Sequence, residues 1–270
     1  MSGPLTGVKV VEFAGIGPGP FSCMMLADMG ADVLRIDRAM NVGGEGKVQP
    51  KFNNLLRGRK NIAIDLKNPE GVELALSLCE KADILIEGFR PGVMERLGLG
   101  YEAVRALNPT VIYASITGYG AEGPWSTRPG QDLLAQSLSG LPWLNGSGDG
   151  PPVPVGIALA DIITSIHLAH GVTAALLKKE RTGEGSRVDT SLLESMLDLQ
   201  FELVSAHLND PSVLVQRGAP HTAHAFLQAP YGTYPTSDGY IALAMGSVPD
   251  LGELVGLDAL AEFGDPDTWW

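Results

Sequence analysis

The chain has 270 residues, 44% of them hydrophobic, which is enough for one large domain or two smaller domains with a well-formed core. Its formal net charge of −12 argues against a general nucleic-acid-binding protein, although a local basic cluster can still bind an anionic ligand. The first residues lack a signal-peptide pattern and no stretch has the uninterrupted apolar length of a membrane span, so we expect a cytoplasmic protein without a membrane partner.

The N-terminal part of the chain predicts a βαβ unit. A β-branched apolar run, a glycine and proline loop, a helical pattern and a second strand follow one another at residues 8–13, 14–20, 21–29 and 31–37. The length suits a right-handed parallel crossover. The loop lacks the G-x-G-x-x-G spacing, and Pro18 and Pro20 remove two backbone N–H groups, which disfavours an NAD or FAD site. A loop that brings the backbone close to another ligand stays open.

Basic residues are concentrated after the second predicted strand. They are Arg38, Lys47, Lys51, Arg57, Arg59 and Lys60. Such a run is commonly a solvated face of the protein, and that interpretation stays open. The alternative is a phosphate site. Arg38 stands at the carboxyl end of a strand, where α/β sheets bind ligands, and an arginine can bind a phosphate through two hydrogen bonds.

Further strands alternate with helices along the chain. We expect strands over residues 61–66, 82–88 and 110–116, and a helix over residues 69–81. With the opening unit this gives at least five strands alternating with helices, which predicts a doubly wound α/β sheet. Basic residues recur after strand ends, at Arg90 and Arg96 among others, and this recurrence indicates one phosphate-bearing ligand.

Cysteine and histidine spacing excludes several kinds of site. Cys23 and Cys79 lie in apolar helical patterns without a CxxC or Cys/His partner spacing, so we expect buried thiols in a reducing compartment. His221 and His224 have no nearby carboxylate or cysteine to complete a ligand set, so no metal site is expected. The sequence has no G-x-S-x-G motif, so a serine triad is not expected either.

One acid stands directly before a long apolar run. The run, residues 162–177, has the i+3 and i+4 spacing of a buried helix, and Asp161 precedes it. One interpretation is an N-cap, because an aspartate there accepts a hydrogen bond from a free backbone N–H. The other is a nucleophile, because helix N-terminal amides keep a carboxylate ionised at neutral pH and can stabilise an oxyanion. Asp132 could cap a helix over residues 133–141 or face the same ligand as Asp161.

The C-terminal part predicts a second, smaller domain. A helix over residues 192–208 closes the first domain, and a proline-rich irregular stretch after it is typical of a linker. Two short strands, residues 231–234 and 240–245, flank a Ser-Asp-Gly turn and predict a hairpin. The expected organisation is a large domain, a linker and the start of an apparently incomplete small domain, at residues 1–209, 210–230 and 231–270.

The sequence resembles the class III (CaiB/BaiF-type) CoA-transferase family, which also includes the α-methylacyl-CoA racemases. The matching stretches, in family order from Val10 to about Ala244, are VVEFAGIGPGPF, ADMGADVLRID, NIAIDLKNPEG, ADILIEGFRPGVMERLGLGYE, ITGYGAEGP, RPGQDLLAQSLSG, ALADI, RTGEGSRVDTSLLE and PYGTYPTSDGYIALA.

This resemblance implies a Rossmann-like sheet that binds CoA, an interlocked homodimer, and Asp161 as the nucleophile. It implies acyl-CoA and a carboxylic acid as substrates, with no tightly bound cofactor. It also implies which residues surround CoA: Gly17, Pro18, Arg38, Ile64, Asp65, Leu66, Lys67, Gly88, Phe89, Arg90, Arg96, Pro129, Gly130 and Gln131.

Two alternatives to a CoA-transferase stay open. Racemases of the family use a histidine at the position of Gln131 and a glutamate near Val248, and neither glutamine nor valine exchanges a proton near neutral pH, so a transferase is favoured over a racemase-type enzyme. The other alternative is a catalytically inactive CoA-binding fragment. Family members are usually longer, and residues 217–220, which align with the family's glycine-rich flap, are poor in glycine.

Overall fold

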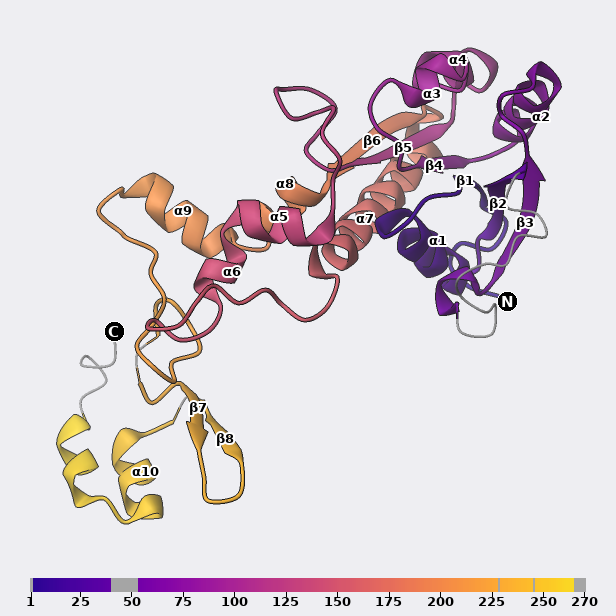
Figure 1. The fold of residues 1–270 in the computed structure, drawn as a ribbon. Coiled ribbons are helices and arrows are strands. Elements are labelled where there is room, and N and C mark those ends of the chain that lie inside the picture. Colours follow the sequence, from indigo (N-terminus) through magenta and orange to yellow (C-terminus); the bar gives the residue numbers. More distant parts are fainter. Residues whose placement is uncertain (1, 40–52, 228, 245, 265–270) are drawn as a thin grey trace. The chain divides into compact units, whose positions relative to one another are not determined.

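The computed structural model describes residues 2–39, 53–227, 229–244 and 246–264. The chain divides into two compact units (Figure 1). The sheet unit comprises Met1–Ser139 and Ile157–Leu199, and the hairpin unit comprises Gly140–Gly156 and Gln200–Trp270. The domain limits expected from the sequence stay a prediction. Lys47 and Lys51 of the basic run lie outside the described residues.

A parallel sheet forms the centre of the sheet unit. Its strands are β1 (Lys9–Phe13), β2 (Asp32–Arg38), β3 (Arg59–Ile64), β4 (Ile84–Glu87), β5 (Ile112–Thr117) and β6 (Ser186–Ser191). In the described residues these six strands have the order β3-β2-β1-β4-β5-β6, and every neighbouring pair is parallel. This confirms the predicted doubly wound α/β class. The strand order reverses between β1 and β4, and open α/β sheets bind ligands beyond the carboxyl ends of the strands at such a reversal.

Helices cover both faces of this sheet. Their bounds are α1 (Pro18–Asp28), α2 (Pro69–Glu80), α3 (Val93–Arg96), α4 (Tyr101–Leu107), α5 (Asp132–Ser139), α7 (Leu159–Thr182) and α8 (Leu192–Asp198), with a short 3-10 turn, η3 (Asn54–Leu56). Because side chains alternate along a strand, β1 sends Val10 to a core beneath α1 and α7 and Val11 to a core beneath α2, α3 and α4. Cys23 and Cys79 are buried free thiols, one in each core, as predicted.

Several helices differ from their predicted bounds. The first helix begins at Pro18 rather than residue 21, because a proline in the first turn needs no hydrogen-bond acceptor for its nitrogen. The helix expected over residues 133–141 ends at Ser139, since Gly140 adopts a left-handed conformation (φ 83°) and a separate turn, α6 (Leu141–Leu144), follows. The helix expected over residues 192–208 is divided into α8 and α9 (Phe201–Asn209).

The interpretation of Asp161 as an N-cap is wrong. The helix α7 begins at Leu159, so Asp161 is its third residue, and the N-cap is Ala158, which has no side-chain oxygen to accept a hydrogen bond. The residues before Asp161 carry none of the usual capping signals, and the helix start therefore escaped the sequence pattern. The carboxylate of Asp161 lies in the first turn, where the backbone N–H groups at the helix start stabilise negative charge.

The helix α7 is long and apolar enough to cross a membrane by length and composition, which the sequence analysis did not expect. Its Leu168, Val172 and Leu176, however, are buried in the core beneath α1 and the sheet. Core helices of globular proteins pass the same test, so the length of α7 is weak evidence for a membrane span.

The hairpin unit contains the predicted hairpin. Its strands, β7 (Gly232–Pro235) and β8 (Tyr240–Leu243), pair antiparallel. The helix α10 (Val248–Val255) and the 3-10 turn η4 (Asp258–Phe263) follow. Elsewhere in this unit Arg217 donates Nη1 to the carbonyl oxygens of Ser147 (2.8 Å) and Pro151 (3.0 Å), and its guanidinium lies 4.4 Å from the ring centre of Trp143. Arg217 thus holds residues 140–156 within the unit.

Candidate active site

A cavity of about 430 Å³ lies at the carboxyl ends of β1, β4 and β5. This is the place where the strand order reverses, so the cavity stands where a doubly wound sheet binds its ligand. The lining comes from the segments after these strands and from the first turns of α1, α5, α7 and α8. The sequence-predicted residues among the lining are Pro18, Gly88, Phe89, Arg90, Pro129, Gly130, Gln131 and Asp161.

Asp161 brings a partly buried carboxylate to this cavity. Its backbone N–H donates to Oδ1 of Asp132 at 3.1 Å. Burial, together with the negative charge of Asp132, raises the pKa of Asp161 from 3.8 to about 6. A carboxyl with this pKa is still about nine-tenths ionised at pH 7. The side chain is therefore available as a nucleophile at neutral pH.

Gly17 lies against the carboxylate of Asp161. Its φ is 76°, in the region that favours glycine, and a Cβ atom at this position would stand only 2.6 Å from Oδ2 of Asp161. The glycine loop after β1 therefore does bring its backbone close to the site. What it approaches directly is a carboxylate of this same chain.

Asp132 joins the first turn of α5 to that of α7. While Oδ1 accepts from the backbone of Asp161, Oδ2 accepts from Nε2 of Gln136 at 2.6 Å. Gln136 is buried and also donates to the carbonyl oxygen of Ile157 at 3.3 Å. Asp132 is the first residue of α5 rather than the residue before it, and it lines the same cavity as Asp161, so the alternative in which it faces the same ligand as Asp161 stays a prediction.

Glu87 is a lining residue that the sequence analysis missed. It ends β4, is 7% exposed, and its Oε2 accepts from the backbone N–H of Phe89 at 2.8 Å. Burial raises its pKa to about 7. The available signal was an acid at the end of an otherwise apolar strand, ILIE, directly before the predicted Gly88. Glu87 is thus a second carboxyl of the cavity that titrates near neutral pH.

A second cavity, of about 620 Å³, lies beyond the carboxyl ends of β1, β2 and β3. Phe13, Phe89 and Arg90 line both cavities. The remaining sequence-predicted residues that line the second cavity are Arg38, Ile64, Asp65, Leu66 and Lys67. The predicted CoA-contacting set is therefore distributed over two cavities with a shared wall.

Two predicted residues line neither cavity. Gly17 instead touches Asp161, and Arg96 is exposed at the end of α3. The roles of all these residues stay predictions. Metal ligation finds no support in the part of the chain that the structure describes, where no group of three His, Cys, Asp or Glu side chains could hold an ion.

The basic run after β2 divides between ion pairs and the second cavity. Exposed Arg57 pairs with Asp28 at 2.5 Å, and exposed Lys60 pairs with Asp32 at 3.1 Å. Arg59 is buried and pairs with Glu12. Arg38 lines the second cavity, so of the residues placed by the structure Arg38 is the one that fits the phosphate-site interpretation.

Two glycines close the loop that precedes Asp132. A Cβ at Gly118 would stand 2.5 Å from the Cα of Gly130, and a Cβ at Gly130 would stand 2.4 Å from the Cα of Gly118. Only glycine allows two backbones to approach this closely. The loop over residues 119–129 therefore starts and ends at one point, and it carries Ser126 and Arg128 to the cavity wall.

Comparison with known proteins identifies the family. The sequence model of CoA-transferase family III matches residues 5–267. This chain belongs to CoA-transferase family III. The family resemblance expected from the sequence motifs is thus confirmed.

Several relatives of this family III chain have named activities. It is 35% identical to a succinate–glutarate CoA-transferase of Agrobacterium fabrum, over 96% of this chain and 68% of the relative. It is 34% identical to a succinyl-CoA:glutarate CoA-transferase of Mus musculus, over 90% of this chain and 57% of the relative. An acyl-CoA transferase of Fusarium pseudograminearum is 37% identical, over 88% of this chain and 55% of the relative. The chain therefore spans between about half and two thirds of these proteins.

The fold is also that of solved family structures. A CAIB/BAIF family protein from Brucella suis superposes with a TM-score of 0.83 at 33% identity, over 97% of this chain and 72% of that protein. A protein from Mycobacterium tuberculosis superposes with the same TM-score at 31% identity, over 97% of this chain and 71% of that protein. The family III chain thus shares most of its described architecture with both.

Proposed function

We propose that this family III chain carries the catalytic centre of a CoA-transferase, which exchanges CoA between an acyl-CoA thioester and a free carboxylic acid through a covalent intermediate on Asp161. The observation that carries the proposal is the position of Asp161, an ionisable carboxylate in the first turn of α7 that faces the cavity at the reversal of strand order. Asp161 supplies a nucleophile, and the helix start supplies N–H groups for charge stabilisation.

The proposed first half-reaction loads CoA onto the protein. A carboxylate oxygen of Asp161 attacks the thioester carbonyl carbon, the carbon–sulfur bond breaks, and a mixed anhydride and CoA thiolate form. The thiolate then attacks Cγ of Asp161, which releases the donor acid as a carboxylate and leaves an aspartyl-CoA thioester. Covalent storage divides a difficult exchange into easier steps.

The second half-reaction reverses this order. The incoming carboxylate attacks Cγ of the aspartyl thioester and releases CoA thiolate, giving a new mixed anhydride. The thiolate attacks the carbonyl carbon of the incoming acyl group, which yields the new acyl-CoA and restores the Asp161 carboxylate. A pKa of about 6 suits Asp161 to this cycle, because it is ionised at neutral pH yet more basic than an exposed aspartate.

The second cavity would hold the adenosine and phosphate end of CoA. Arg38, Lys67 and Arg90 bring cationic side chains to its lining, and such side chains bind phosphates. The rest of that lining is rich in apolar groups, Phe13 and Phe89 among them, which suits a purine ring. Because Phe13, Phe89 and Arg90 also line the first cavity, the pantetheine arm would pass along this shared wall towards Asp161.

Trapping of the intermediate tests the proposal. The protein is incubated with an acyl-CoA and then with hydroxylamine, and the modified residue is located by mass spectrometry. We expect a hydroxamate at Asp161 and no CoA exchange in the Asp161→Asn variant. The control is Asp28→Asn, which changes an exposed aspartate that lines neither cavity. Exchange that persists in Asp161→Asn, or a label that appears only elsewhere, contradicts the proposal.

Substrates, assembly and location are part of the same proposal. The named relatives act on succinate, glutarate, mesaconate and malate thioesters or acids, so short dicarboxylates are the first substrates to assay. We expect a homodimer, as the family resemblance implies, and a cytoplasmic location. Light scattering of the purified full-length protein measures the first, and a fluorescent fusion in its own cell shows the second.

A further inference from the structure

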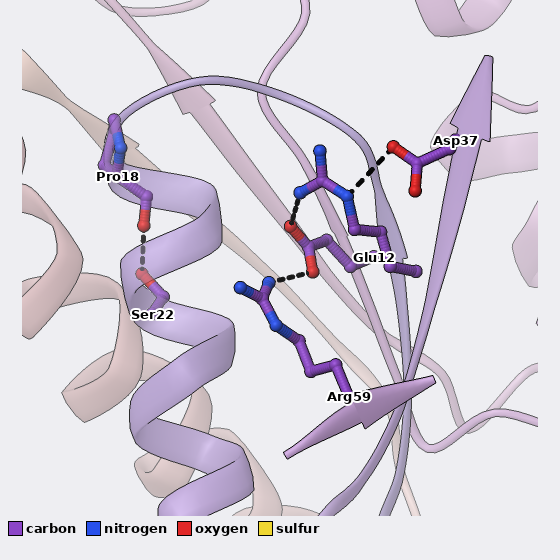
Figure 2. Close-up of polar contacts among 6 residues, drawn as sticks. Glu12, Pro18, Ser22, Asp37 and Arg59 are labelled. Atoms are coloured by element: carbon purple, nitrogen blue, oxygen red, sulfur yellow. Dashed lines mark hydrogen bonds and ion pairs between the residues drawn. The ribbon is translucent and has the colours of Figure 1, made fainter. Parts of the chain in front are cut away.

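Two buried serines connect the first turn of α1 to that of α7. Ser22 Oγ donates to the carbonyl oxygen of Pro18 at 2.8 Å and reaches the carbonyl oxygen of Ser165 at 3.1 Å. Ser165 Oγ reaches the carbonyl oxygens of Pro18 at 3.0 Å and Asp161 at 2.5 Å. Both serines are 0% exposed. Figure 2 shows the contact between Ser22 and Pro18 at the start of α1.

Two of the carbonyl groups that these hydroxyls bind, those of Pro18 and Asp161, lie beside the close approach between Gly17 and the Asp161 carboxylate. Pro18 directly follows Gly17, and Asp161 carries the carboxylate against which Gly17 lies. The Ser165 hydroxyl has one hydrogen, which it shares between the carbonyl of Pro18 in one helix and that of Asp161 in the other. The serine pair therefore fixes the separation of the two backbones at the point where Gly17 and Asp161 meet.

Apolar packing does not need these hydroxyls. Cys23 and Leu26 of α1 and Leu168 and Val172 of α7 belong to one buried core, which already holds the two helices together. Replacing apolar side chains by two buried hydroxyls adds no stability to such a core, because each hydroxyl must find a hydrogen-bond acceptor there. They do set a distance and a direction, which a purely apolar contact leaves free.

We propose that Ser22 and Ser165 are positioning residues that hold the Asp161 carboxylate against the glycine loop after β1, in the orientation required for attack on a thioester. This inference rests on the proposed function of Asp161. Misplacement of a reacting group by about 1 Å can reduce a rate by roughly 100-fold. The serine substitutions leave the other ionisable side chains of the cavity lining in place, namely Glu87, Arg90, Arg128 and Asp132.

The test compares Ser22→Ala, Ser165→Ala and the double variant with a matched control. The control is Thr173→Val, since Thr173 makes the same type of hydroxyl-to-carbonyl bond in α7, to Ala169 at 2.7 Å, and among the described residues its hydroxyl makes no hydrogen bond to α1. The first measurement is the single-turnover rate of Asp161 acylation by an acyl-CoA, with its KM. The second is the titration midpoint of the Asp161 carboxyl, followed by carbon NMR and assigned by its loss in Asp161→Asn.

We expect the acylation rate to fall by roughly 10- to 100-fold in either single variant, with KM changed less than about two-fold. The double variant should be no slower than the slower single variant, because the two serines act as a unit. The Asp161 midpoint should fall towards that of an exposed aspartate, since looser packing admits water. Thr173→Val should change neither. If the double variant does not fold, the singles carry both readouts.

Unchanged acylation and an unchanged midpoint in the serine variants overturn the inference, as does an equal loss in Thr173→Val. Failure of the proposed function would give a different experimental result. In that case the unaltered protein is not acylated at Asp161 at all, and the titration midpoint alone decides whether the serines position the carboxylate.

Discussion

Glu12 holds together three strands of the sheet, and its replacement by glutamine should destabilise the sheet unit strongly. Glu12 of β1 is 0% exposed and pairs with Arg35 of β2 at 2.7 Å and with Arg59 of β3 (Figure 2). Arg35 has a second partner, Asp37, at 3.1 Å. The Arg59 side chain is 1% exposed, and its Nε and Nη2 have no hydrogen-bond partner among the described residues. Glu12 is thus the compensating charge for Arg59.

The expected cost follows from this geometry. Removing one partner of a buried ion pair costs about 3–5 kcal/mol, because the other charge stays buried without compensation. Glu12→Gln removes the charge from two pairs but spares Arg35 its contact with Asp37, so the same range applies, about 3–5 kcal/mol. For a unit of this size each kcal/mol corresponds to about 2–4 °C in Tm, which gives a decrease of roughly 10 °C.

Thermal unfolding at pH 7, followed by circular dichroism, measures the effect. The matched control is Lys60→Gln, which breaks an exposed pair between β2 and β3 and should cost less than about 1 kcal/mol. The double variant Glu12→Leu/Arg59→Met should be more stable than Glu12→Gln, because it also removes the buried positive charge of Arg59, which Glu12→Gln leaves uncompensated. A decrease below about 3 °C in Glu12→Gln, or one no larger than in Lys60→Gln, refutes the reasoning.

Three further changes have defined outcomes. The Asp161 pKa of about 6 predicts that the acylation rate falls about tenfold per pH unit below pH 6 and is level above pH 7. Asp132→Asn should move the midpoint of this pH profile to lower pH, because a negative charge beside Asp161 is lost; stopped-flow rates that stay flat from pH 5 to 7 contradict the prediction. Gly17→Ala should abolish exchange at a cost of about 1–3 kcal/mol in stability, since its Cβ meets Asp161 and its φ is strained; near-normal exchange rates contradict that. Burial raises the pKa of Cys79 to about 12 and also raises that of Cys23. A disulfide-forming thiol reagent at pH 8 should therefore label both thiols only when urea unfolds the protein, and rapid labelling of the native protein contradicts this.

Much of the sheet could be predicted because its signals are local. The apolar, β-branched runs that became β1, β4 and β5 are each bounded by glycine, proline or polar residues, and their alternation with helices fixes a parallel sheet. Asp161 was identified as a candidate for the same reason, as a single acid directly before a long apolar pattern. Local patterns therefore gave the architecture and the principal candidate of the site.

The contacts that organise the site are not local. Asp132 is 29 residues from Asp161, and Ser22 is 143 residues from Ser165. Glu12 meets Arg59 across 47 residues, so its pattern, an acid within an apolar strand, gave no hint of its partner. Register and helix packing decide such pairs, and neither is determined by residue spacing along one segment.

The contact between Gly118 and Gly130 separates a surface loop, residues 119–129, from the rest of the cavity wall. Because the loop of residues 119–129 leaves and returns at one point, its ends stay fixed whatever its own sequence or length, at a small entropic cost. Ser126 and Arg128 can then be exchanged for other side chains while Gln131, Asp132 and the carboxylate beyond them keep their places. Under the function that we propose, substitutions in this surface loop should alter which acid is accepted without displacing the nucleophile.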